Sequence, residues 1–184
     1  MDMPLEPLTD GHEVRVYEGD LIVDEFDGPS DGGDGSHNVV VDGNLIVKGK
    51  LSWTEYAGGS FLVVTGAISA GAIHARGCPV LFASHLEAET VVGCEDGGDG
   101  GAIVATTIRA GLVLQTSYFR VEGGTVEGLV IGDPGFVKPR LDVKAREAAK
   151  ALGDEFIDPE TERPSVQAVV AAMLAGREVG RPAS

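Results

Sequence analysis

The stretch NVVVDGNLIVKGKL, residues 38–51, carries the pattern that decides the fold. Its apolar residues alternate with other residues, as they do in a strand with one buried face. Glycines interrupt the alternation at Gly43 and Gly49. Similar units, each with a short apolar strand, a small or polar turn and an alternating segment, recur along the chain. They begin at Val14, Phe61, Val80, Ala102 and Phe119.

One aliphatic anchor marks each of the six units. The anchors are Leu21, Leu45, Ile68, Leu86, Ile108 and Val126, and their spacings by subtraction are 24, 23, 18, 22 and 18 residues. Repeats of this length made of short strands are typical of a β-solenoid, in which stacked coils bury a face that no coil buries alone. The sequence therefore predicts an all-β, single-stranded parallel β-helix of about six coils.

Glycine has a role in this reading, because a wound strand must turn sharply and Gly accepts a positive φ. The predicted corners are Gly43, Gly49, Gly66, Gly71, Gly123 and Gly128. An antiparallel sandwich or barrel is the alternative fold, which hairpin turns such as Asp42-Gly43 would support.

The longer spacings indicate insertions at residues 25–37, 52–60 and 94–101, which should project from one edge of the rod. Insertions gathered on one side often form the binding surface of a repeat protein. The middle insertion carries two aromatic residues, which are favoured at interfaces but would also serve to cover the solenoid edge. The predicted partner interface comprises Trp53, Glu55, Tyr56, Asp31, Asp34, Glu95, Asp96 and Asp99. The alternative for the Asp/Gly loops is tolerated length variation without a function.

After Gly135 the apolar period changes to that of a helix. Residues 139–152 and 165–178 each carry an apolar stripe at helical spacing. Two C-terminal helices are therefore predicted to cover an end or a flank of the solenoid, with a dimer seam as the alternative. The expected organisation is an N-terminal arm at 1–13, the β-solenoid at 14–135 and a helical C-terminal cap at 136–184.

The chain is acidic, with 29 acidic and 14 basic residues and a net charge of −15. Such a surface repels nucleic acid and anionic membranes and attracts basic partners, although simple solubility would also account for it. Cys78 and Cys94 form no CxxC or Cys/His motif, so no zinc site is expected. No signal peptide or membrane-spanning run is seen, and we expect a cytoplasmic protein with both thiols reduced.

Residues with catalytic potential are few. The histidines are His12, His37, His74 and His85. His74 and His85 occupy different positions relative to their anchors and do not stack, so both are interpreted as isolated surface residues. No nucleophile or phosphate-loop motif is present in the required context. We predict no catalytic residue, no metal and no cofactor. An enzyme with a site on the solenoid flank, holding His74 or His85 beside carboxylates, remains a further hypothesis.

The segments VVVDGNLIVKGKL (39–51), LVVTGAISAGAI (62–73) and FRVEGGTVEGLVIG (119–132) resemble the bactofilins, bacterial cytoskeletal polymers built from β-helices. The resemblance covers about residues 14–132 and implies a right-handed helix and a structural polymer. Bactofilin coils are uninterrupted and their tails are usually disordered. The insertions and predicted helices of this chain depart from that pattern, which puts polymerisation in doubt.

EGDLIVD (18–24) and VVVDGNLIVKG (39–49) are also similar to small bacterial β-solenoid proteins that occur beside polymorphic toxins and act as immunity proteins. This resemblance implies tight, non-catalytic binding of a toxin domain. A net charge of −15 fits a basic toxin as the partner. We therefore expect a protein-binding solenoid, monomeric or homodimeric rather than filamentous, that binds neither nucleic acid nor membrane.

Overall fold

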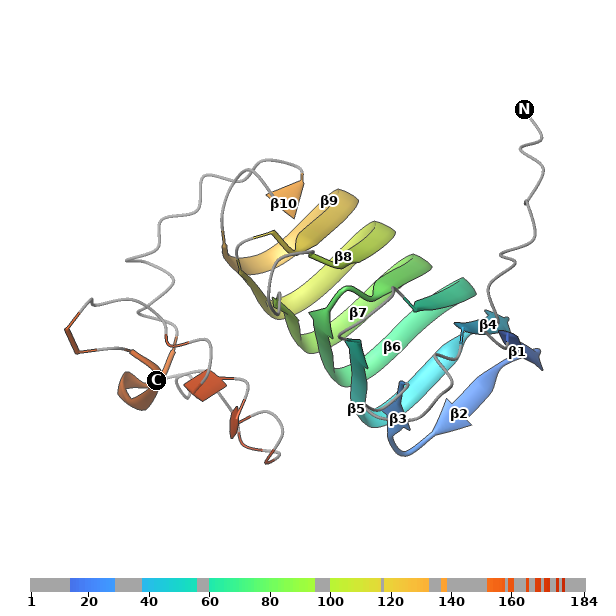
Figure 1. Ribbon diagram of the computed structural model, residues 1–184, viewed down its shortest axis with the longest axis horizontal. Coiled ribbons are helices and arrows are strands. Elements are labelled where there is room, and N and C mark those ends of the chain that lie inside the picture. The colour runs from blue at the N-terminus through green and yellow to red at the C-terminus, as the bar shows by residue number, and fades with distance from the viewer. Residues whose placement is uncertain are drawn as a thin grey trace.

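The computed structural model shows an all-β parallel solenoid, with strands stacked in sequence order along its long axis (Figure 1). It describes most of residues 14–132 and parts of the C-terminal segment. The described residues are 14–28, 38–55, 60–94, 100–116, 118–132, 137–138, 152–157, 159–160, 165, 168–169, 171–172, 175 and 177.

Ten strands form one sheet that winds around the core. They are β1 (Val14–Glu18), β2 (Leu21–Val23), β3 (Phe26–Asp27), β4 (Asn38–Asp42), β5 (Leu45–Glu55), β6 (Phe61–Gly77), β7 (Val80–Cys94), β8 (Ala102–Gln115), β9 (Arg120–Ile131) and β10 (Val137–Lys138). Every described pairing is parallel. The parallel β-helix is thus confirmed, and the antiparallel alternative is wrong.

The solenoid has about four turns, so the prediction of six coils is wrong. The long strands β6, β7, β8 and β9 each continue around the rod without a break. The earlier units are interrupted, since one divides into β1, β2 and β3 and the next into β4 and β5. All five side chains of β1 are exposed. Counting sequence units therefore overestimated the number of complete turns.

The register of the units agrees with the anchor alignment. The paired anchors are Leu21↔Leu45, Leu45↔Ile68, Ile68↔Leu86, Leu86↔Ile108 and Ile108↔Val126. In a parallel stack each side chain lies about 4.8 Å from its equivalent, so repeated aliphatic positions make a continuous buried column. Leu45, Ile68, Leu86 and Ile108 are at most 2% exposed and lie in the main core cluster.

The predicted corner glycines have a different physical role from the one expected. Of the six, only Gly128 has a positive φ, at +125°. Gly66 shows the more general reason, because a Cβ there would lie 2.6 Å from the carbonyl oxygen of Gly43. Successive coils approach too closely at such corners for a side chain to fit. Close backbone approach, rather than left-handed conformation, therefore explains most of these glycines.

The prediction of a helical C-terminal cap is also wrong. Among the described residues of this region, the one helix with assigned bounds is the short 3-10 helix η1 (Asp154–Phe156). Residues 168–169 and 171–172 have α-helical conformation, but they do not amount to an assigned helix. Most of residues 139–152 lie outside the described part of the chain. The described C-terminal residues cover a flank of the solenoid rather than its end. This second core cluster contains Val92, Cys94, Leu112, Leu114, Ile131, Leu152, Phe156, Val169 and Ala172.

Candidate functional site

Trp53 was predicted to be a surface anchor, and its position in the structure contradicts that role. Its side chain is 0% exposed and its indole Nε1 donates a hydrogen bond to Ser60 Oγ at 2.7 Å. The ring also stacks on Phe26, with 6.1 Å between centroids. Trp53 continues strand β5 and is paired with Ala75, whose small side chain leaves room for the indole. The insertion predicted from residue 52 therefore starts later, beyond the end of β5.

The rest of the predicted interface stays a prediction. Glu55 is the last residue of β5. Tyr56, Asp31, Asp34, Glu95, Asp96 and Asp99 lie outside the described residues. The strand ends from which the last two insertions leave do stack, since Glu55 pairs with Gly77 and Arg76 pairs with Cys94. These insertions thus depart from one corner of the solenoid.

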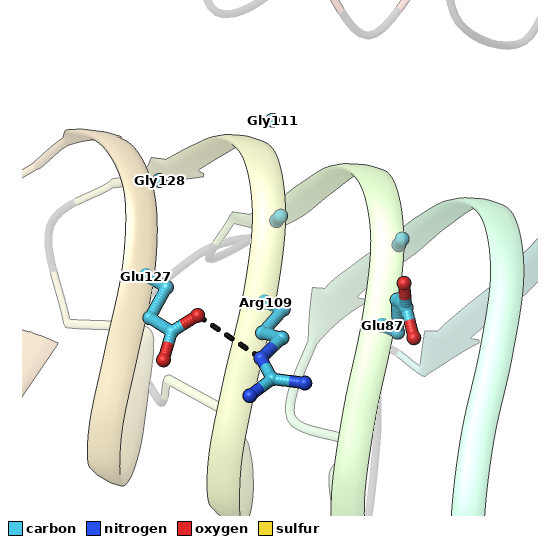
Figure 2. Close-up of a pocket in the computed structure, with 7 residues that line it drawn as sticks. Glu87, Arg109, Gly111, Glu127 and Gly128 are labelled. Carbon is cyan, nitrogen blue, oxygen red and sulfur yellow. Dashed lines mark hydrogen bonds and ion pairs between the residues drawn. The ribbon is translucent and has the colours of Figure 1, made fainter.

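A shallow groove runs along another corner, on the outside of the long strands (Figure 2). It consists of two hollows of about 290 and 570 Å³ that share Glu87, Ala88 and Gly111. Ala70, Ala88 and Ala110 follow one another from coil to coil along the floor, and their small side chains belong to the core beneath it. We call this feature the corner groove. Its shape suits an extended polymer segment lying along the rod axis better than a compact small molecule.

The charges beside the corner groove come from stacked side chains. Glu87, Arg109 and Glu127 are paired from β7 to β8 to β9. Figure 2 shows these three side chains projecting from successive coils, with Arg109 Nε 3.0 Å from Glu127 Oε2. Both partners are exposed, so this ion pair contributes at most about 1 kcal/mol to stability.

Two carboxylates at the corner groove form no ion pair with any described residue. In the described part of the chain, neither Glu87 nor Glu89 has an ion pair. Both side chains are exposed, and they flank Ala88 on β7. Lys48, at the opposite end of the groove, is already paired with Asp24 at 2.9 Å. The corner groove therefore presents two carboxylates without an ion pair to solvent, and Arg109 lies in register beside Glu87.

A third hollow holds the arrangement that the enzyme hypothesis required. Its volume is about 210 Å³ and its lining includes His85, Glu87, Thr107 and Arg109. His85 and Glu87 point outward from the same strand and are both exposed. The hollow is smaller than the roughly 300–1,000 Å³ of most small-molecule sites. It overlaps the corner groove at Glu87, and its exposed polar groups are equally suited to contacting a protein.

His74 is buried, so its interpretation as a surface histidine is wrong. It is 4% exposed, and it faces away from the core because its neighbours Ile73 and Ala75 point inward. Burial, together with the charges of Arg76 and Lys50, lowers the pKa of His74 from 6.5 to about 4. The imidazole is therefore neutral at pH 7.

A thiol lies beside this imidazole. Cys94 Sγ is 3.7 Å from His74 Nε2, across one coil, and His74 Nδ1 has no hydrogen-bond partner among the described residues. Cys94 is 7% exposed, and neither it nor Cys78 forms a disulfide. Within the described ranges, no group of three or more His, Cys, Asp or Glu side chains is placed to hold a metal ion.

A row of apolar side chains on the outer surface was missed in the sequence. The outer apolar row consists of Val16, Val40, Val63, Phe82 and Val104, paired in that order. The signal was present, because residues 39–41 and 62–64 are entirely apolar rather than alternating. Continuous apolar runs of this kind are typical of strands covered on both faces.

Comparison with known proteins gives no further guide: no family model, curated protein or solved structure matches this chain. The described residues contain no helix of the length and apolar character needed to cross a membrane.

Proposed function

We propose that this protein is a non-catalytic binding solenoid whose partner is a basic protein. The carboxylates of Glu87 and Glu89 on the corner groove carry the proposal, since neither forms an ion pair within the described part of the chain. They sit on a chain with a net charge of −15, which favours fast association with a cationic partner. The flat floor of alanines leaves the groove open to a segment lying along the rod.

In its sharpest form, the proposal is an immunity protein that neutralises a basic bacterial toxin. The similarity of residues 18–24 and 39–49 to toxin-associated solenoids supports this form. An inhibitor of this kind needs a rigid surface and charge complementarity but no catalytic group.

The test begins with capture of a partner from native lysate by the tagged protein, followed by light scattering. We expect one basic protein in a fixed stoichiometry. The double variant Glu87→Gln/Glu89→Gln should slow its association about two- to tenfold, with a weaker dependence on salt. Asp154→Asn/Glu155→Gln is the matched control, because it removes the same charge from exposed residues of η1. An equal loss in both variants would contradict a role for the corner groove.

A bactofilin-like polymer is the second candidate, and the end of the solenoid favours it. Strand β1 pairs with β4 on one side, and Val14 and Val16 are 49% and 60% exposed. Such an edge is a template for another chain. Electron microscopy of the purified protein would then show filaments, and Val16→Lys would abolish them. A strictly monomeric or dimeric protein at high concentration would contradict this candidate.

A further inference from the structure

We propose that the outer apolar row is a second contact surface, which binds an extended segment carrying apolar residues with flanking lysine or arginine. This inference rests on the proposed function, since it describes the same partner's chemistry. It concerns a different face of the rod, formed by the first part of each coil rather than by the corner groove.

The geometry of the row is that of a continuous ridge. Five paired positions at about 4.8 Å per coil give a length of about 19 Å. The side chain of Val16 is 60% exposed and that of Phe82 is 43% exposed. The other members of the row, Val40, Val63 and Val104, are half-buried. Phe61 and Val80, two positions before Val63 and Phe82, are also partly exposed and widen the ridge.

This surface differs from the flank that the C-terminal segment covers. There the outward row of Val92, Leu114 and Ile131 is buried by Leu152 and Phe156. No described segment packs in the same way on the outer apolar row. Solenoid faces that stay in water normally carry polar residues, and an uncovered apolar strip is typical of an interaction site.

The charges around the row identify the kind of partner. Glu18 and Asp42 are exposed and occupy neighbouring positions in the register of β1 and β4. They lie two residues beyond Val16 and Val40. Glu122 pairs in register with Val104, and its charge is already balanced by an ion pair with Arg120 at 3.7 Å, so Glu18 and Asp42 are the residues that indicate a cationic partner. A second copy would bring like charges together on two chains of net charge −15, which opposes self-association. A segment with apolar residues between cationic ones would match both the apolar row and the acidic residues beside it.

The probe is a fluorescent peptide of alternating Leu and Lys, with Leu/Glu and Ser/Lys peptides as comparisons. Binding would be measured by anisotropy to the wild-type protein, Phe82→Ser, and the control Tyr118→Ser, which removes another aromatic side chain that is 59% exposed. We expect the Leu/Lys peptide to bind most tightly, and its affinity to fall at least tenfold in Phe82→Ser alone. Circular dichroism checks the fold, and Val63→Thr, which nearly preserves side-chain shape, provides a second variant.

Several outcomes would overturn the inference. Equal binding of the Leu/Lys and Ser/Lys peptides would mean that charge alone acts. An unchanged affinity in Phe82→Ser and Val63→Thr would place binding elsewhere. Phe82-dependent dimerisation in sedimentation, or Phe82-dependent binding to phosphatidylcholine vesicles, would identify a different occupant. If a captured partner binds Phe82→Ser normally, the proposed function stands and this surface fails. If the peptide binds the row but no partner is captured, the proposed function fails and the surface stands.

Discussion

His74 combines burial with an unsatisfied nitrogen. A neutral imidazole is favoured there because the surroundings exclude water and two cationic side chains lie near. An unpaired buried polar atom costs about 1–3 kcal/mol. The repeat alone did not reveal this burial, because His74 lies in register with Val92 on the flank that the C-terminal segment covers.

The pH dependence of stability should report this burial. The pKa of His74 is about 4 in the folded protein and 6.5 in the unfolded chain. The full contribution of neutral His74 to stability is therefore present above pH 6.5. It is lost as the pH falls from 6.5 through 4, and the total loss is up to about 3 kcal/mol. His74→Leu should have a flatter dependence between pH 6.5 and 4 when urea unfolding is measured. His85→Leu, at an exposed site, serves as the control, and parallel curves for wild type and His74→Leu would refute the prediction.

At the scale of the coil, Gly128 is the corner at which both conformation and space require glycine. Its φ is +125°, and an added Cβ would overlap the carbonyl oxygen of Ala110 on the coil below. Gly128→Ala should therefore lower the free energy of unfolding by more than 2 kcal/mol, since both strain and a clash arise.

Gly19 provides a matched control for that variant. Its φ is +82°, but a Cβ there meets nothing within 4 Å. Gly19→Ala should cost only about 1 kcal/mol, from backbone conformation alone. Equal losses in the two variants, measured by denaturant titration, would show that contact between coils is unimportant at Gly128.

The stacked strands were predictable because a parallel ladder repeats its chemistry. An aliphatic anchor such as Leu86 must lie on an aliphatic neighbour in the next coil, so the alignment of sequence units gives the register directly. The place of Trp53 was not predictable by the same argument. Its equivalents in the next two coils are Ala75 and Gly93, so the repeat does not predict a buried aromatic side chain at this position. A tryptophan at the boundary between a strand and a loop is compatible with a buried position or with a surface position.

The candidate site was the less predictable part. The sequence pointed to the acidic loops as a binding surface. The corner groove instead consists of alanines together with Glu87 and Glu89, which form no motif in the sequence and come together only when three coils stack. The number of complete turns was misjudged for a related reason, because a sequence unit does not show whether its strand is continuous.

For the whole molecule, the C-terminal segment should contribute strongly to stability. Phe156 is 2% exposed and belongs to the cluster that covers Val92, Leu112 and Leu114. Phe156→Ala should lower the free energy of unfolding by about 3–5 kcal/mol. If the segment instead opens locally, hydrogen exchange would rise around those three residues first. Glu155→Ala, at the exposed neighbouring position, is the control. A loss below 1 kcal/mol with unchanged exchange would refute this role.

The two ends of the rod differ, and this gives the molecule a mechanical direction. Strand β1 is held along one edge and its side chains are exposed, while the later coils are braced on their outer side by the C-terminal segment. Tension applied along the axis would therefore peel the rod from β1 onward, one coil at a time. The coils that the C-terminal segment covers would unfold last. A partner bound near β9 would therefore stay attached under a force that unfolds the strands near β1.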